Sequence, residues 1–303
     1  MTNHFSYPHG RRTFLKNIAA AAGSSLPARA AASDWKKKIG LELYTVRDLL
    51  AKDFEGTMAK VAEIGYKEVE PTSYGGLEPK AFRALLDRLK MTAPSTHAGA
   101  TEGPNLEKEL EGFRIMGIRY IEIRGARQAP GPPTVEAIKR RAEGINKHGE
   151  IAKQFGMKIL IHNHTEEFEF LEGGKLSMYD VLLAETNPAT VTMQLDIGWA
   201  SVAGQNVIDL FKKNPGRYEL WHVKDATGIK RAPSNATPAE RRKLAKLVPV
   251  GEGDVDYGPI FAQAQLAGLK HYVIEQDNAG QDGNDSLAAA RTSYRNLMRV
   301  LSK

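Results

Sequence analysis

The chain has 303 residues, of which 42% are hydrophobic and 26% are charged, which is typical of a globular protein. Its formal net charge of +6 does not indicate a nucleic-acid-binding face, because +4 of it lies in residues 1–30 and the remaining +2 is small. Because there is no cysteine, disulfide bonds, thiolate metal sites and cysteine nucleophiles are excluded.

The first 30 residues have the features of a secretion signal. Arg11 and Arg12 precede Phe14-Leu-Lys16 and an alanine-rich run, and Ala28-Arg-Ala30 matches a small-x-small cleavage site. The pattern resembles a twin-arginine export signal, and a basic amphipathic tail is the alternative. We therefore expect residues 1–30 to be a leader and 31–303 to be the folded domain. The mature protein is expected in a bacterial periplasm, without a membrane anchor after cleavage.

From residue 39 onward, short apolar runs alternate with amphipathic segments. The runs predict strands at 39–44, 67–70, 91–97, 118–123, 158–164, 191–196, 220–224 and 272–275. The amphipathic segments predict helices at 54–64, 79–89, 106–116, 135–155, 178–185, 207–213, 259–267 and 286–301. Strict alternation of strand and helix over about 260 residues predicts the α/β class and a single (β/α)8 TIM barrel.

The alternative fold is a doubly wound open sheet, which usually has a glycine-rich phosphate loop after its first strand. The segment that follows the first strand here, Tyr44-Thr-Val-Arg-Asp48, contains no glycine. One connection looks inserted: residues 225–256 follow the seventh strand and are expected to form a rim segment with a short helix at 238–246.

Titratable residues follow the last four predicted strands, and the carboxyl ends of barrel strands converge on one mouth. The set consists of Glu167, Asp196, His222 and Glu275. Three carboxylates in one mouth would repel each other unless a cation neutralised them. We therefore expect these four residues to bind a divalent metal ion, and their mixed oxygen and nitrogen ligands suit Mn²⁺, Mg²⁺ or Co²⁺.

Other strand-end residues are candidates for contact with a substrate: Glu70, His97, His164, Trp199 and Lys224. His162 and His164 are two residues apart and should face the same side, although His162 could equally be an ordinary core histidine. Lys224 could hold a sugar oxygen or pair with a carboxylate at the rim. Trp199 could form a wall against a sugar ring or pack under its loop.

Six motifs resemble those of the sugar phosphate isomerase/epimerase family of xylose isomerase-like barrels. They are Gly40-Leu-Glu-Leu-Tyr-Thr-Val-Arg-Asp48, His162-Asn-His164 with Glu167-Phe168, Leu195-Asp-Ile-Gly-Trp199, His222-Val-Lys-Asp225, Gly251-Glu-Gly-Asp-Val-Asp256 and Val273-Ile-Glu-Gln-Asp277. The resemblance implies a divalent metal held by Glu167, Asp196, His222 and Glu275, with Glu166 and Glu169 as neighbours of the fifth-strand ligand. It also implies that Glu167 and Glu275 exchange a substrate proton from opposite faces.

The expected activity is therefore a metal-dependent sugar isomerase or epimerase that removes a proton beside a carbonyl and passes through an enediolate. Export and the absence of a glycine-rich phosphate cradle favour an unphosphorylated keto-sugar as its substrate. A 3-keto-glycoside lyase or hydrolase of the same fold is one alternative, and a non-catalytic periplasmic sugar-binding protein is another. The expected partner is a small sugar and not nucleic acid, and a homo-oligomer is compatible with the fold.

Overall fold

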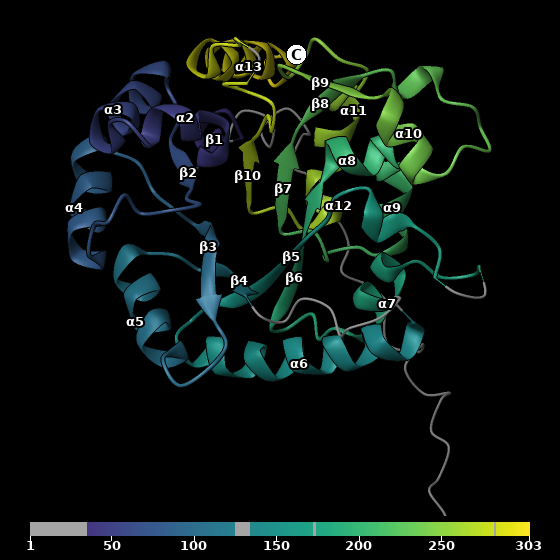
Figure 1. Ribbon diagram of the computed structural model, residues 1–303, viewed down its shortest axis with the longest axis horizontal. Helices are drawn as coiled ribbons and strands as arrows, with labels where there is room; N and C mark the ends of the chain where they lie inside the picture. The colour runs from purple at the N-terminus through teal and green to yellow at the C-terminus, as the bar shows by residue number, and fades with distance from the viewer. Residues whose placement is uncertain (1–34, 125–133, 172–173, 282) are drawn as a thin grey trace, which may run out of the picture.

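Eight parallel strands form a nearly closed barrel surrounded by helices (Figure 1), which confirms the predicted α/β barrel. The computed structural model describes residues 35–124, 134–171, 174–281 and 283–303. The expected leader, residues 1–30, lies outside the described residues. None of the helices in the described part of the chain is both long enough and apolar enough to cross a membrane.

The barrel strands follow one another around the ring in chain order. The strands are β1 (Gly40–Glu42), β2 (Glu68–Glu70), β3 (Ser95–Thr101), β4 (Tyr120–Arg124), β5 (Lys158–His162), β6 (Val191–Asp196), β7 (Leu220–Val223) and β10 (His271–Ile274). Their hydrogen-bonded order is β2-β1-β10-β7-β6-β5-β4-β3. A parallel bridge between Glu68 and Thr92, with the Val69 N–H donating to the Thr92 carbonyl over 2.9 Å, joins the two ends of this order.

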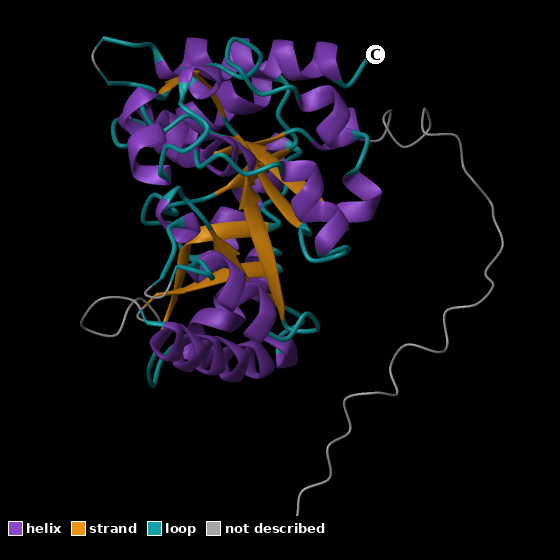
Figure 2. Cartoon of the chain, turned by 90° about the vertical axis from the view of Figure 1, so that its right-hand side faces the viewer, coloured by secondary structure: helices purple, strands orange, loops and turns teal. Residues whose placement is uncertain are grey.

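Helices lie outside the strands in both views (Figures 1 and 2). The outer helices are α3 (Phe54–Ile64), α4 (Pro79–Leu89), α5 (Leu106–Met116), α6 (Val135–Gln154), α7 (Met178–Glu185), α9 (Val207–Lys213), α11 (Tyr257–Phe261), α12 (Ala264–Ala267) and α13 (Ser286–Val300). The predicted helix 259–267 is thus two short helices, which are separated at Ala262 and Gln263. Shorter helices at the ends of strands were not predicted: α2 (Arg47–Leu50), α8 (Ile197–Val202), and the 3₁₀ helices η2 (Leu43–Val46) and η3 (Glu166–Phe168).

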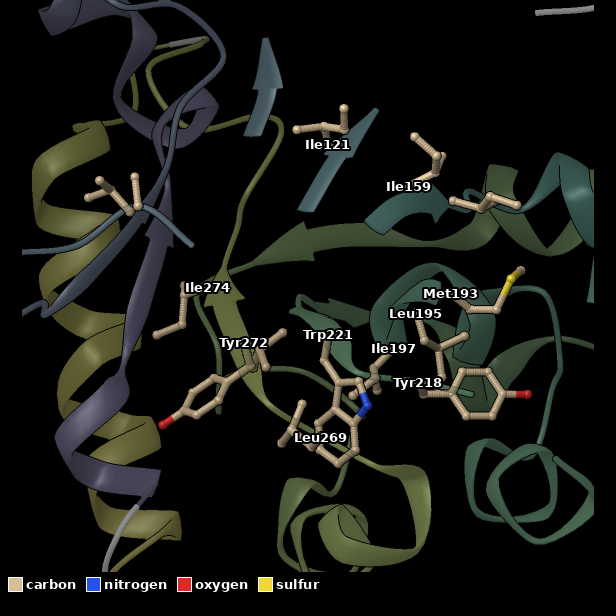
Figure 3. Close-up of a cluster of buried hydrophobic side chains, with 14 of the residues drawn as sticks. Ile121, Ile159, Met193, Leu195, Ile197, Tyr218, Trp221, Leu269, Tyr272 and Ile274 are labelled. Carbon is tan, nitrogen blue, oxygen red and sulfur yellow. The ribbon is translucent and has the colours of Figure 1, made fainter. Parts of the chain in front are cut away.

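Side chains along each strand alternate between the helices and the barrel interior. On β6, Val191, Met193 and Leu195 belong to the large apolar core between strands and helices. Figure 3 shows part of this core, where Leu195 lies beside its strand partner Trp221 of β7. The interior contains a separate apolar cluster of Tyr120, Leu160 and Leu220. The alternate positions of β6, Thr192, Gln194 and Asp196, therefore face the axis of the barrel.

One predicted strand is displaced along the chain. The third strand was expected at 91–97 but runs from Ser95 to Thr101. Pro94 has no N–H to donate, so regular pairing with β4 begins only after it. The register then shifts between Thr96 and Ala100, where Gly99 adopts a φ of +54°.

The inserted connection forms a small cap on the rim of the barrel. It contains the antiparallel hairpin of β8 (Asp225–Thr227) and β9 (Lys246–Val248), with α10 (Pro238–Leu244) between the two strands. The predicted helix of the rim segment is therefore present. Asp225 fixes this cap, because its buried carboxylate accepts hydrogen bonds from the backbone N–H groups of Ala226, Gly251, Gly253 and Val255 over 2.9–3.1 Å.

Replacing Asp225 by alanine should loosen the rim segment. The substitution leaves several enclosed N–H groups without an acceptor, and we expect the free energy of unfolding to fall by about 3 kcal/mol. Limited proteolysis should cut first within residues 225–256, and thermal unfolding should report the loss of stability. Asp256→Ala is the matched control, because its exposed carboxylate only caps α11. Unchanged stability and protease resistance in Asp225→Ala would contradict the anchoring role.

Candidate active site

Inward-facing polar side chains converge at the carboxyl ends of the strands. The cluster consists of Glu42 of β1, Glu70 of β2, His97 of β3, His162 of β5, Asp196 of β6, His222 of β7 and Glu275, which directly follows β10. Apart from the partly buried His97 and His162, these side chains are buried. Most of the strands of the ring therefore contribute an ionisable group to one mouth.

Four of these residues form a group suited to a metal ion. One potential ligand atom from each of His162, Asp196, His222 and Glu275 lies within 4.8 Å of all the others. Three of the four predicted ligands are thus brought together. The fourth member is His162, whereas Glu167 belongs to a separate group with His164 and Glu166. The structure does not bring Glu167 into this group of four, and its role as a metal ligand stays a prediction.

The local backbone explains this difference. β5 ends at His162, and the side chain of Asn163 then accepts a hydrogen bond from the Asp196 N–H over 3.0 Å, which directs the chain out of the barrel. The turn of η3 brings the Glu167 carboxylate back onto its own loop, where it accepts the His164 N–H over 2.7 Å. Strand alternation was the signal that could have identified His162, because it lies two residues after the inward-facing Leu160.

His222 is held with one ring nitrogen toward the metal-binding group. Its Nε2 lies 2.6 Å from Oε1 of Glu70. Its Nδ1 lies 2.7 Å from Oε2 of Glu275 and 4.0 Å from Oδ2 of Asp196. A carboxylate that accepts the N–H of one ring nitrogen fixes the orientation of a ligating histidine. Glu70 therefore orients Nδ1 of His222 toward the other ligands.

A second buried network lies beside this group. His97 Nε2 lies 2.6 Å from the side-chain oxygen of Gln194, whose amide donates to Glu70 over 2.6 Å. Nδ1 of His97 lies 3.3 Å from Oε1 of Glu42. Glu70, expected to touch a substrate, is fully buried behind His222 and serves to position it. His97 remains partly accessible and stays a candidate for substrate contact.

Lys224 is also enclosed and not open to a substrate. Its Nζ lies 2.8 Å from Oε2 of Glu275, 2.9 Å from Oδ2 of Asp277 and 3.0 Å from Oδ2 of Asp196, and its side chain is 0% exposed. The ammonium group thus neutralises two of the potential metal ligands. Glu42, Gln194 and Asp277 were not predicted as site residues. Alternation along β1 and β6 places Glu42 and Gln194 on the inner side, whereas Asp277 lies beyond the end of β10.

The ionisation of the cluster reflects crowding of its carboxylates. Burial and the neighbouring Glu275 raise the pKa of Glu42 to about 8. Burial alone would raise the pKa of Asp196, but Lys224 and His162 bring it down to about 2. Burial and the adjacent His222 hold the pKa of His162 well below its usual range, so this imidazole is neutral and its nitrogen can act as a ligand.

This donor set fits a divalent metal. Two imidazoles and two carboxylates match ligands that transition metals accept, and Oε2 of Glu42 is buried beside them without a hydrogen-bond partner in the described structure. The buried carboxylates outnumber the cations around them, and a bound metal ion would compensate the remaining negative charge. His162, Asp196, His222 and Glu275 are the residues that would hold it.

The ligand set that the structure brings together predicts different metal contents for two variants. His162→Ala should lower metal affinity more than tenfold, because loss even of a supporting group typically costs about 10–100-fold. Glu167→Gln should leave the metal content of purified protein unchanged. Elemental analysis after dialysis against a weak chelator measures both. If His162→Ala kept its metal and Glu167→Gln lost it, the metal ligand on this side of the site would be Glu167, as expected from the sequence, and not His162.

Trp199 lies between the inner cluster and the rim. It is 5% exposed, with the Lys224 ammonium 5.3 Å and the Arg242 guanidinium carbon 4.0 Å from its ring centroid. Arg242 belongs to α10, so Trp199 connects the rim segment to Lys224 and leaves little surface for a sugar ring. His164 lies closer to the opening, with its ring centroid 4.9 Å from that of His162 and 6.4 Å from that of Trp199.

Comparison with known proteins identifies the family. The family described as "Xylose isomerase-like TIM barrel" matches residues 58–301. The chain belongs to the xylose isomerase-like TIM barrel family. An inosose dehydratase of Clostridium perfringens (strain ATCC 13124) is 30% identical over 263 residues, which cover 75% of this chain and 84% of that protein. One from Geobacillus kaustophilus is 26% identical over 256 residues, covering 73% of this chain and 80% of that protein.

Solved structures with this fold include proteins of several activities. A sugar phosphate isomerase/epimerase from Parabacteroides distasonis has a TM-score of 0.67 at 21% identity and covers 93% of this chain and 96% of its own. An L-ribulose 3-epimerase has a TM-score of 0.61 at 14% identity, with coverages of 87% and 94%. A xylose isomerase-like protein from Mycobacterium smegmatis in complex with magnesium has a TM-score of 0.58 at 15% identity, with coverages of 89% and 98%. At these identities the likeness establishes the fold alone.

Proposed function

We propose that this protein is a metal-dependent lyase that eliminates water or an alcohol from an unphosphorylated polyhydroxy ketone, such as a keto-inositol or a 3-keto-glycoside. The observation that carries this proposal is the similarity to inosose dehydratases over more than four-fifths of the length of one of them. These relatives favour the lyase over the isomerase or epimerase that was expected first. Among divalent metals, the two imidazoles favour Mn²⁺, Co²⁺ or Zn²⁺ over Mg²⁺.

The residues of the mouth can be assigned to the steps of such an elimination. When bound, a divalent metal would polarise the ketone and acidify the neighbouring C–H bond. Glu275 is the proposed base, because its carboxylate lies at the mouth and is held in place by His222 and Lys224. The electrons of the broken C–H bond form a carbon–carbon double bond as the oxygen on the next carbon departs with its bonding pair. Glu167 and His164, at the opening, are the proposed source of the proton that turns this oxygen into water or an alcohol.

Turnover in D₂O tests this proposal directly. The metal-loaded protein would be incubated with an inosose, a 3-keto-glucoside and a ketohexose, and the products followed by NMR and mass spectrometry. Loss of one molecule of water from the inosose, or release of the alcohol from the glycoside, is the expected result. The Glu275→Gln variant serves as the inactive control.

The second candidate function is epimerisation, the activity named for an L-ribulose 3-epimerase that shares this fold. It shares the first proton transfer with the lyase but returns the proton to carbon. If the ketohexose gained deuterium, lost no water or alcohol and became a new stereoisomer, the protein would be an epimerase and not a lyase. A protein that binds a sugar without exchanging any C–H for deuterium would be a binding protein.

We also propose that the protein is exported to the periplasm by the twin-arginine route. Its support is the sequence of residues 1–30, in which Arg11 and Arg12 precede an alanine-rich run. Replacing both arginines by lysine should leave the full-length precursor in the cytoplasm, which cell fractionation and immunoblotting would measure. Periplasmic recovery of the lysine variant at the level of the native protein would contradict this route.

A further inference from the structure

A cavity lies beside the acidic mouth, and none of the residues that line it belongs to the acidic cluster. Its volume is about 440 Å³, within the range of small-molecule sites. The loops that follow β1 and β2 form its walls, so it opens on the face that also bears the carboxyl ends of the strands. In Figure 1, α2 and α3 lie next to β1 and β2. Arg47, Leu50, Lys52, Phe54, Thr72 and Ser73 are among the lining residues.

The charge of this cavity is opposite to that of the mouth. Arg47 and Lys52 supply two positive charges, whereas none of the described residues that line the cavity is an aspartate or glutamate. The hydroxyl groups of Thr72 and Ser73 add neutral hydrogen-bonding groups, and Phe54 supplies apolar surface. A cavity of this lining favours an anionic group attached to a polar unit of sugar size.

Arg47 is held in place before any ligand binds. Its Nη1 donates to the Tyr44 carbonyl over 2.7 Å, and its Nη2 donates to the Asp277 carbonyl over 2.9 Å. The guanidinium carbon also lies 4.0 Å from the centroid of the Tyr44 ring. These contacts use only part of the five N–H donors of an arginine. The remaining donors form a planar fork of the kind that recognises carboxylates and phosphates.

The cavity and the mouth share a wall. The backbone carbonyl of Asp277 binds Arg47, while its side chain lies 2.9 Å from Nζ of Lys224 in the inner cluster. One molecule could therefore place its reacting ketone at the mouth and a second unit over Arg47. In the wall of the cavity, Gly75 packs so closely on Phe54 that a Cβ atom there would lie 2.4 Å from the ring.

We propose that this cavity is a subsite for a second, oxyanion-bearing unit of the substrate, bound by Arg47 and Lys52. The inference rests on the proposed function, since that function supplies the ketone unit at the mouth. A carboxylate and a phosphate share the chemistry that the two cations recognise. A sugar acid joined to the keto-sugar is the form compatible with an unphosphorylated substrate.

Binding of simple probes tests the subsite without turnover. The full-length protein, with metal and after treatment with chelator, would be titrated calorimetrically with glucuronate, glucose 6-phosphate and glucose at low and high salt. At least one anionic probe should bind more than about tenfold more tightly than glucose, more weakly at high salt, and should still bind after the metal is removed. Lys52→Met and Arg47→Met should each weaken that binding by about tenfold, the loss of one charge-assisted hydrogen bond.

The exposed Lys60 on α3 provides the matched control, and Lys60→Met should bind all three probes as the native protein does. Because Arg47 also contacts the backbone, Lys52→Met is the decisive variant, and Lys52→Arg should restore binding. Equal affinity for glucose and both anions, or unchanged affinity in Lys52→Met, would overturn the subsite. Binding of glucose 6-phosphate alone would support the subsite and count against an unphosphorylated substrate. An inactive enzyme that still bound the anions at Lys52 would overturn only the proposed function.

Discussion

Glu275→Gln should lower turnover of the keto-sugar substrate by about 10²–10⁴-fold, the usual contribution of a general base. Glutamine keeps the shape of the side chain and can still accept a hydrogen bond from Lys224. It cannot take up the substrate proton. Steady-state kinetics at saturating metal, together with deuterium exchange into unreacted substrate, measure the loss. Both rates should fall together, because both depend on removal of the same proton.

A matched variant separates this effect from a general loss of charge. Glu252 is an exposed glutamate in the rim segment, and Glu252→Gln should retain native turnover. Circular dichroism and elemental analysis of Glu275→Gln would establish that it is folded and contains metal. Substantial activity in folded, metal-loaded Glu275→Gln would show that another group removes the proton.

Lys224→Met should destabilise the metal-free protein by about 3–5 kcal/mol, the cost of removing one partner from a buried ionic cluster. The lysine side chain is fully buried, and without its ammonium group Asp196, Glu275 and Asp277 would face one another uncompensated. A divalent cation held by Asp196 and Glu275 would replace part of the lost positive charge. Added metal should therefore stabilise the variant more than it stabilises the native protein.

Chemical denaturation with and without chelator measures both parts of this prediction. Lys270→Met, which changes an exposed lysine just before β10, should leave the free energy of unfolding nearly unchanged. A loss below about 1 kcal/mol in metal-free Lys224→Met, the value of an ordinary surface pair, would contradict the role of the ammonium group in balancing the cluster. Equal stabilisation of both proteins by metal would show that Lys224 and the cation do not compensate the same carboxylates.

The barrel could be predicted because its elements carry strong periodic signals. Helices α3, α4, α5, α7 and α9 have the bounds that the hydrophobic pattern predicts, and β6 does as well. The alternation along β6 and β7 also places Asp196 and His222 correctly at the mouth. Short segments were missed: α2 and α8 have only four and six residues, too few to show a helical period.

The ligand from the fifth strand could not be assigned by its residue type alone. Glu167 is a carboxylate near the end of a strand, but a buried hydrogen bond from the Asp196 N–H to the side chain of Asn163 turns the chain before Glu167 is reached. Non-local bonds of this kind leave no mark on the local pattern. Glu42 and Asp277 were overlooked for a related reason, because what makes them part of the site is the closing of the ring, which brings β1 and β10 together.

Because side chains alternate along the strands, the residues that determine packing and the residues that determine chemistry lie on opposite sides of the barrel wall and can evolve separately. Residues such as Met193 and Trp221 hold the helices to the ring, whereas their immediate neighbours Gln194 and His222 carry the polar chemistry. A mutation at an inner position can alter the reaction without disturbing the packing of the helices against the strands. The same barrel can thus support dehydratases and epimerases that differ in a few inward residues, while the residues between strands and helices change independently.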